Sequence, residues 1–88
     1  MSEKSEKAGR LRCCVPFCQR TTGEPFAEWI CAKHWPATSR ETRARYAKLR
    51  ATLRKGRRRG RDLPHTRRAA NALWEKLKIE AIERAAGI

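Results

Sequence analysis

Four cysteines and one histidine lie within residues 13–34, and this cluster constrains the fold more than any other feature of the chain. A tetrahedral zinc site takes four ligands of these types, usually as two close pairs separated by a loop. Cys31 and His34 form a C-x2-H pair, while Cys18 pairs with either Cys13 (C-x4-C) or Cys14 (C-x3-C). The spacing therefore predicts a structural Zn²⁺ site with four protein ligands, and it does not decide between Cys13 and Cys14.

Other uses of the four thiols fit the sequence less well. Two disulfides would need an oxidising compartment, whereas the first ten residues (MSEKSEKAGR) lack the apolar stretch of a secretory signal. An iron–sulfur cluster is an alternative, but the histidine and the tight spacing favour zinc. A polar chain of 88 residues, with a mean hydropathy of −0.83, also gains little stability from burial alone. A metal-stabilised fold is therefore expected.

Residues 13–18 (CCVPFC) and 31–34 (CAKH) resemble the short C-x-V-x-x-C … C-x2-H zinc knuckles of phage and prophage proteins, some of which are attached to HNH-type endonucleases. Residues 28–35 and 82–88 are also similar to small prophage proteins. The resemblance leaves Cys14 in a variable position. Nuclease activity is not implied, because the chain has no further His-Asn-His constellation and His65 stands alone. Metal ligation is implied for the four positions that match, Cys13, Cys18, Cys31 and His34.

Positive charge is concentrated in one segment. Of the 22 Lys and Arg and the nine Asp and Glu, eleven basic and one acidic residue fall within residues 36–61, a net charge of +10 out of +13 for the chain. A near-neutral metal module joined to such a segment predicts contact with nucleic-acid phosphates. A solvated basic linker and an anionic membrane surface are weaker interpretations. The candidate phosphate-contacting residues are Arg43, Arg50, Arg54, Arg57, Arg58, Arg59 and Arg61.

The expected fold class is mainly α, with a small zinc-bound knuckle and β-hairpin module followed by an antiparallel two-helix hairpin. Residues 1–10 are expected to form a disordered tail, and residues 11–36 the zinc-binding module, with a turn at 21–25 and a short strand at 26–30. A basic helix is expected within residues 37–61. A loop and a second amphipathic helix, packed on the first, are expected within residues 62–88.

Helix signals place the ends of both helices. Thr38 and Glu41 match a capping box for the first helix. Its apolar seam is narrow, and two glycines, at positions 56 and 60, mark its end. The second helix is expected over residues 67–86, with Asp62 or Thr66 as its N-cap, a stop at position 87 and an i,i+4 pair between residues 80 and 84. The seam residues of the first helix are Thr42, Tyr46, Leu49 and Leu53.

Several large apolar residues have two interpretations each. Aromatic residues flank the metal ligands at positions 17, 26, 29 and 35, and we favour a small core that shields the thiolates over base stacking. Trp74 is expected in the core between the helices. The second face of the last helix, with Ile79, Ile82 and Ala86, would cover the zinc module, form a dimer or bind a partner.

The function predicted from these features is nucleic-acid binding, with DNA preferred to RNA, by a phage-derived regulator of transcription in the bacterial cytosol or nucleoid. An RNA-binding protein is one alternative. Another is an adaptor or inhibitor that acts on a host protein through the C-terminal helix. An enzyme is not expected, because the sequence presents no paired carboxylates, phosphate-binding loop or nucleophile–base arrangement. No apolar run approaches the roughly 20 residues that span a membrane.

Overall fold

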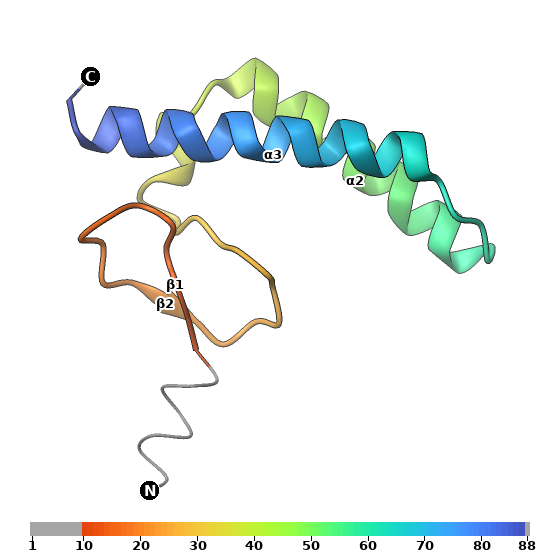
Figure 1. Ribbon diagram of the computed structural model, residues 1–88, viewed down its shortest axis with the longest axis horizontal. Helices are drawn as coiled ribbons and strands as arrows, with labels where there is room; N and C mark the ends of the chain where they lie inside the picture. Colours follow the sequence, from red (N-terminus) through yellow and green to blue (C-terminus); the bar gives the residue numbers. More distant parts are fainter. Residues whose placement is uncertain (1–9, 88) are drawn as a thin grey trace, which may run out of the picture.

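The computed structural model describes residues 10–87, so the tail expected over residues 1–10 lies outside the described residues apart from Arg10. Two short strands, β1 (Leu11–Arg12) and β2 (Thr21–Thr22), precede the 3₁₀ helix η1 (Trp35–Ala37). Two long helices follow, α2 (Arg40–Arg58) and α3 (Pro64–Ala85). The helices pack on one another and run in opposite directions; loops of the N-terminal module lie beside the C-terminal half of α3, and the two strands lie farther from the helix (Figure 1). The expected fold class is confirmed.

The β-hairpin forms between residues 11–12 and 21–22, whereas the sequence predicts a strand at residues 26–30. Strands β1 and β2 are antiparallel, with Leu11 opposite Thr22 and Arg12 opposite Thr21. Residues 21–22 are therefore strand rather than turn, in keeping with the β preference of threonine. The expected strand at residues 26–30 is absent from the described structure. This segment meets the knuckle through a hydrogen bond from the Cys14 N–H to the Trp29 carbonyl oxygen (2.8 Å), and it forms no ladder with β1.

The first turn of α2 is held by a residue from α3. The N-cap is Ser39, whose hydroxyl accepts a hydrogen bond from the Thr42 N–H (3.3 Å), so the Thr38 capping box is wrong by one residue. The Ser39 N–H donates to a Glu80 carboxylate oxygen at 2.8 Å. Arg84 donates to the Ala37 carbonyl oxygen at 3.2 Å. Glu80 and Arg84 thus hold the entry to α2 instead of pairing with each other as expected.

The C-terminal end of α2 is closed by two backbone hydrogen bonds. The Gly60 N–H donates to the Arg57 carbonyl oxygen (3.1 Å), and the Arg61 N–H donates back to the Gly56 carbonyl oxygen (2.8 Å). This pattern is a Schellman motif, which needs a left-handed residue, and Gly60 has φ +70°. Gly56 lies inside the helix and is buried, because Leu63 packs where a side chain would stand.

Helix α3 starts earlier than expected. Pro64 occupies the first turn, where its fixed φ suits a helix and its missing N–H costs nothing. The N-cap is Leu63, with no side-chain cap, so neither Asp62 nor Thr66 has the expected role. Asp62 instead accepts a hydrogen bond from Arg67 at 2.6 Å on the exposed surface. The helix ends before residue 87, as expected.

Packing between the helices uses the expected seam. Thr42 is buried on α2, and Leu77, the largest fully buried side chain, lies on α3. The rings of Trp35, Tyr46 and Trp74 gather with centroids 5.9–6.3 Å apart. The molecule measures 40 × 38 × 16 Å, so it is a thin slab with few fully enclosed positions. Within the described residues, no helix is both long and apolar enough to span a membrane.

The Schellman motif predicts the effect of one substitution. Replacing Gly60 by Ala lowers the free energy of unfolding by about 1 kcal/mol, because an L side chain is disfavoured at a positive φ. Nothing lies within 4 Å of the added Cβ, so the loss comes from the backbone alone. Chemical denaturation measures it. Gly60→Asn, which adopts this conformation more readily, is the matched control and loses less; equal stability of Gly60→Ala and the native chain would contradict the motif.

Candidate metal centre

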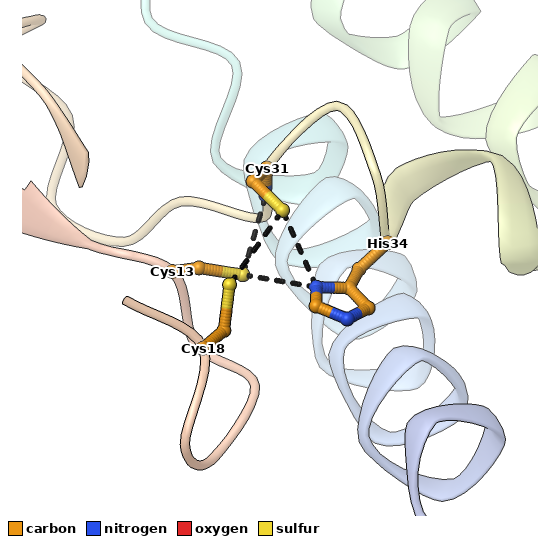
Figure 2. A group of neighbouring side chains, drawn as sticks. All are labelled: Cys13, Cys18, Cys31 and His34. Atoms are coloured by element: carbon orange, nitrogen blue, oxygen red, sulfur yellow. Dashed lines mark hydrogen bonds between the residues drawn. The ribbon is translucent and has the colours of Figure 1, made fainter. Parts of the chain in front are cut away.

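The first pair of candidate ligands belongs to a tight turn that follows β1. Cys13 leaves the strand with its N–H bonded to the Arg20 carbonyl oxygen (3.0 Å), and the chain returns as the Cys18 N–H donates to the Val15 carbonyl oxygen (3.1 Å). Pro16 fixes the second position of this turn. Phe17 occupies the third with φ +69°, a left-handed conformation that favours glycine. The turn brings the two sulfur atoms onto one side of the knuckle (Figure 2).

The second pair is placed by a helical turn. The N–H groups of His34 and Trp35 both donate to the Cys31 carbonyl oxygen, at 3.1 and 2.9 Å. This geometry puts Cys31 and His34 on the same side of the turn, three residues apart. The chain then continues directly into η1 and from there to the N-cap of α2.

Four side-chain atoms converge from these two turns. The sulfur atoms of Cys13, Cys18 and Cys31 and the nitrogen of His34 all lie within 4.8 Å of one another (Figure 2). The Cys18 and Cys31 sulfurs are 3.8 Å apart, and His34 Nδ1 lies 3.7 Å from the Cys13 sulfur and 3.3 Å from the Cys31 sulfur. A tetrahedral ion with metal–sulfur and metal–nitrogen distances of about 2.3 and 2.0 Å separates its ligands by roughly 3.6–3.8 Å. These residues could therefore hold one metal ion.

The thiols of the cluster differ in acidity. Burial raises the pKa of the Cys13 thiol, and hydrogen bonds from the backbone of Val15 and Cys31 only partly offset this effect. Burial also acts to raise the pKa of Cys31, but backbone hydrogen bonds from His34 and Lys33, with the neighbouring thiols, outweigh it and lower this pKa. The Cys31 N–H donates to the Cys13 sulfur at 3.3 Å. A donor of this kind stabilises a thiolate, the form in which cysteine binds metals.

Cys14 does not join the group of four. Its N–H is bonded to the Trp29 carbonyl oxygen, and its half-buried side chain packs against the core around the cluster. The choice between Cys13 and Cys14, which the spacing leaves open, is thus made by backbone direction: successive residues leaving β1 point to opposite sides. The structure describes all four cysteines as free thiols.

The core around the cluster comes from three parts of the chain. Cys13, Cys31, Val15 and Ile30 are buried together with Ala81 of α3, which is 1% exposed. Half-buried apolar side chains surround them: Trp29, Trp35, Trp74 and Ile82. Of the second face expected on the last helix, Ile82 covers the metal module, whereas Ile79 stays 52% exposed.

Two of the four flanking aromatics do not shield the thiolates. Phe17 is 98% exposed and Phe26 is 50% exposed, so the small core expected around the ligands includes Trp29 and Trp35 only. The tight turn explains Phe17, because a residue at its third position points away from the ligands. Phe26 lies in the segment where the expected strand does not form.

A charged anchor that sequence reasoning missed ties this module to α3. One Glu28 carboxylate oxygen accepts a hydrogen bond from Trp74 Nε1 (2.7 Å), and the other accepts one from Lys78 Nζ (2.9 Å). Both bonds lower the pKa of Glu28, with the larger effect from Lys78, so the carboxylate stays ionised. No local signal marks Glu28, because both partners lie 46 or more residues away.

The candidate phosphate-contacting arginines are spread along α2 and the loop after it. Arg43, Arg50 and Arg54 line a shallow hollow on α2 beside Trp35 and Tyr46. A second hollow, near the helix end, is lined by Arg50, Arg57 and Arg61. Arg58 and Arg59 are exposed at the helix terminus outside both hollows. Two further residues that the sequence did not single out also line these hollows: Arg40 and Arg67.

The positive charge of this surface is not balanced by ion pairs. Within residues 10–87, no Lys or Arg of the 40–61 segment takes part in a salt bridge; the three that occur join Arg67 to Asp62 and Lys78 to Glu28 and Glu75. The buried Nε of Arg43 has no hydrogen-bond partner. The positive charge of α2 is therefore available to an external anion.

The four-ligand cluster predicts unequal effects for two neighbouring cysteines. Cys31→Ser abolishes stoichiometric metal binding and unfolds the chain at ambient temperature, because Cys31 is 1% exposed at the centre of the cluster and a structural metal contributes on the order of 10 kcal/mol. Cys14→Ser, the matched control, keeps one ion per chain. Elemental analysis and circular dichroism of the purified variants check both. Metal loss in Cys14→Ser, or its retention in Cys31→Ser, would refute the assignment.

Comparison with known proteins does not identify the function. No protein-family model, curated protein or solved structure matches this chain. The resemblance to prophage zinc knuckles remains a prediction from residues 13–18 and 31–34. The features that bear on function are therefore the Cys/His cluster and the helix of uncompensated arginines that follows it.

Proposed function

We propose that this chain is a zinc-stabilised protein that binds nucleic acid through the arginine-rich surface of α2. The observation that carries the proposal is the uncompensated charge of that helix. Between Arg40 and Arg58 it has nine Lys and Arg against the single acid Glu41. No residue of the described chain neutralises them by a salt bridge. Closely spaced cations on one helix suit a polymer with regularly spaced phosphates.

Zinc is the ion that this donor set favours. Three thiols and one imidazole in a tetrahedral arrangement are typical of structural zinc, whereas magnesium and calcium prefer oxygen ligands. With Cys13, Cys18, Cys31 and His34 all binding, every position of a tetrahedron is filled by the protein. The ion would therefore supply folding energy rather than a reactive site. A site filled in this way is typical of a structural ion, which supports a binding protein rather than a metalloenzyme.

The metal centre is coupled to the arginine surface through a short path. Residue His34 is followed at once by η1, and η1 leads to the Ser39 N-cap of α2. Glu80 and Arg84 hold the same stretch from the α3 side. Folding of the cluster therefore fixes the start and direction of α2 before any anion arrives. A preorganised cationic helix binds without the entropic cost of ordering a flexible tail.

Duplex DNA in a regulatory role and RNA both fit this electrostatic interpretation, and the prophage resemblance motivates the regulator. Arginine predominates among the basic residues of the segment, which suits bidentate contact with phosphate or guanine. An adaptor acting through α3 is supported less well, since Ile82 already packs on the metal module and Ile79 is left as the exposed large apolar residue there. Retention of a protein partner after nuclease treatment would favour the adaptor.

Salt dependence tests the phosphate contacts. Neutralising about six phosphates gives a slope of roughly −5 in a plot of log K against log salt concentration. The double variant Arg54→Gln/Arg57→Gln lowers that slope by about 2 in magnitude and weakens binding to all sequences alike. The matched control, Arg68→Gln/Lys76→Gln on α3, changes the net charge equally and leaves the slope unchanged. Fluorescence anisotropy with labelled DNA and RNA measures these values; no binding, or a flat salt response, would overturn the proposal.

Metal removal tests the coupling between the cluster and α2. A verified metal-free sample loses most of its helical signal and its nucleic-acid affinity, because Ala81, Ile82 and Trp74 of α3 pack against the cluster. Adding Zn²⁺ restores both. Circular dichroism and the same binding titration follow the change. Intact helices with unchanged affinity in the metal-free protein would show that the metal does not support the binding surface.

A further inference from the structure

A groove bordered by aromatic rings opens between the metal module and the two helices. It encloses about 440 Å³, and Arg50 of α2 stands at its polar side. The chain has six aromatic residues, and all but Phe17 line this groove. They come from the loop before the second ligand pair, from η1 and from both helices. The five are Phe26, Trp29, Trp35, Tyr46 and Trp74.

These rings are not sealed into a core. Trp29, Trp35, Tyr46 and Trp74 are all half-buried, and Phe26 is 50% exposed on the rim. Flat apolar surface in contact with water is unfavourable by about 25 cal/mol per Å². Concentrating it in one groove, in a chain that is otherwise polar, is typical of a binding site for a flat apolar group.

The polar residues of the groove are arranged for a phosphate beside that flat group. Arg50 also lines the adjoining hollow with Arg43 and Arg54, so cations continue from the groove along α2. A second adjoining hollow shares Phe26, Tyr46 and Arg50 and adds the side-chain amide of Asn71, which can donate and accept hydrogen bonds.

The one acidic residue of the groove does not repel an anion. Glu28 is held by Lys78 and by the Trp74 indole N–H, so its charge is already compensated. The same hydrogen bond fixes the Trp74 ring in orientation, and Trp35 and Tyr46 pack against that ring. The groove is therefore rigid, aromatic and bordered by positive charge.

We propose that this aromatic groove binds an unpaired nucleobase of a single-stranded polynucleotide, stacked against its rings, while Arg50 contacts the adjoining phosphate. The inference rests on the proposed function, because α2 supplies the phosphate contacts on either side. A base in a duplex is stacked on both faces and cannot enter, so the groove selects single strands or unpaired positions. A peptide side chain would fill the apolar part but would leave the surrounding arginines without an anion.

Oligonucleotides that differ only in their bases test the groove. The ligands are a deoxyribo-oligomer, a ribo-oligomer, an abasic deoxyribose-phosphate strand of the same length and a blunt duplex. Base stacking on aromatic side chains predicts about tenfold or tighter binding of the base-containing strands than of the abasic strand. All three tryptophans of the chain line the groove, so their fluorescence is quenched by the base-containing strands and not by the abasic strand. The deoxyribo- and ribo-oligomers distinguish DNA from RNA as the source of the base.

Two single substitutions locate the effect. Phe26 lies on the exposed rim of the groove, outside any helix or strand, so its replacement removes a ring without disturbing an element. Phe26→Ala lowers the ratio of affinities for base-containing and abasic strands to near one and leaves the salt slope unchanged. Phe17→Ala is the matched control, since Phe17 is 98% exposed on the knuckle and does not line the groove. It leaves the preference intact.

The outcomes separate this inference from the proposed function. Equal binding of base-containing and abasic strands with a steep salt slope would overturn the groove and leave phosphate binding by α2 standing. Loss of the preference in Phe17→Ala, with Phe26→Ala unaffected, would also overturn it, because the bases would then contact the knuckle. Absence of binding to every polymer would overturn both proposals.

Discussion

The convergence of two ligand pairs is the constraint on which the rest of this small protein depends. Only a few apolar residues of the described chain are buried, and two of them, Cys13 and Cys31, belong to the group that could hold a metal ion. A slab 16 Å thick has little interior of its own. The proposed metal would therefore take the place of a large hydrophobic core, and Ala81 of α3 packs against the Cys/His cluster. With the proposed metal bound, helices far along the chain would depend on four side chains near its start.

The same arrangement explains how the proposed binding surface is built from so few residues. The cluster fixes the start of α2, and Glu80 holds the Ser39 N–H from the opposite helix. Arginines then stand along one rigid element while the aromatic rings collect where that element meets the metal module. Arg50 belongs to both surfaces, since it lines the aromatic groove and the neighbouring hollows on α2. Charge and flat apolar surface are thereby offered side by side.

The sequence predicts those features that depend on local spacing. Two ligand pairs, two helices and the α2 seam follow from residues a few positions apart, so periodicity and motif spacing are sufficient. Features that depend on partners far along the chain cannot be predicted from local spacing. Glu28 gives no hint of Trp74, and nothing near Ser39 indicates that Glu80 will bind its N–H. The strand expected at 26–30 is also wrong: the hairpin forms between β1 and β2, and Phe26 is exposed on the groove rim.

Phe17 shows the cost of the tight turn between Cys13 and Cys18. It holds a left-handed backbone conformation that disfavours any L side chain by about 1–2 kcal/mol, and its ring, 98% exposed, recovers almost nothing by packing. Glycine at this position would relieve the strain and remove an exposed phenyl group in one step. The knuckle is thus a suitable place to raise the free energy of unfolding by substitution, since it lies outside both the arginine surface and the aromatic groove.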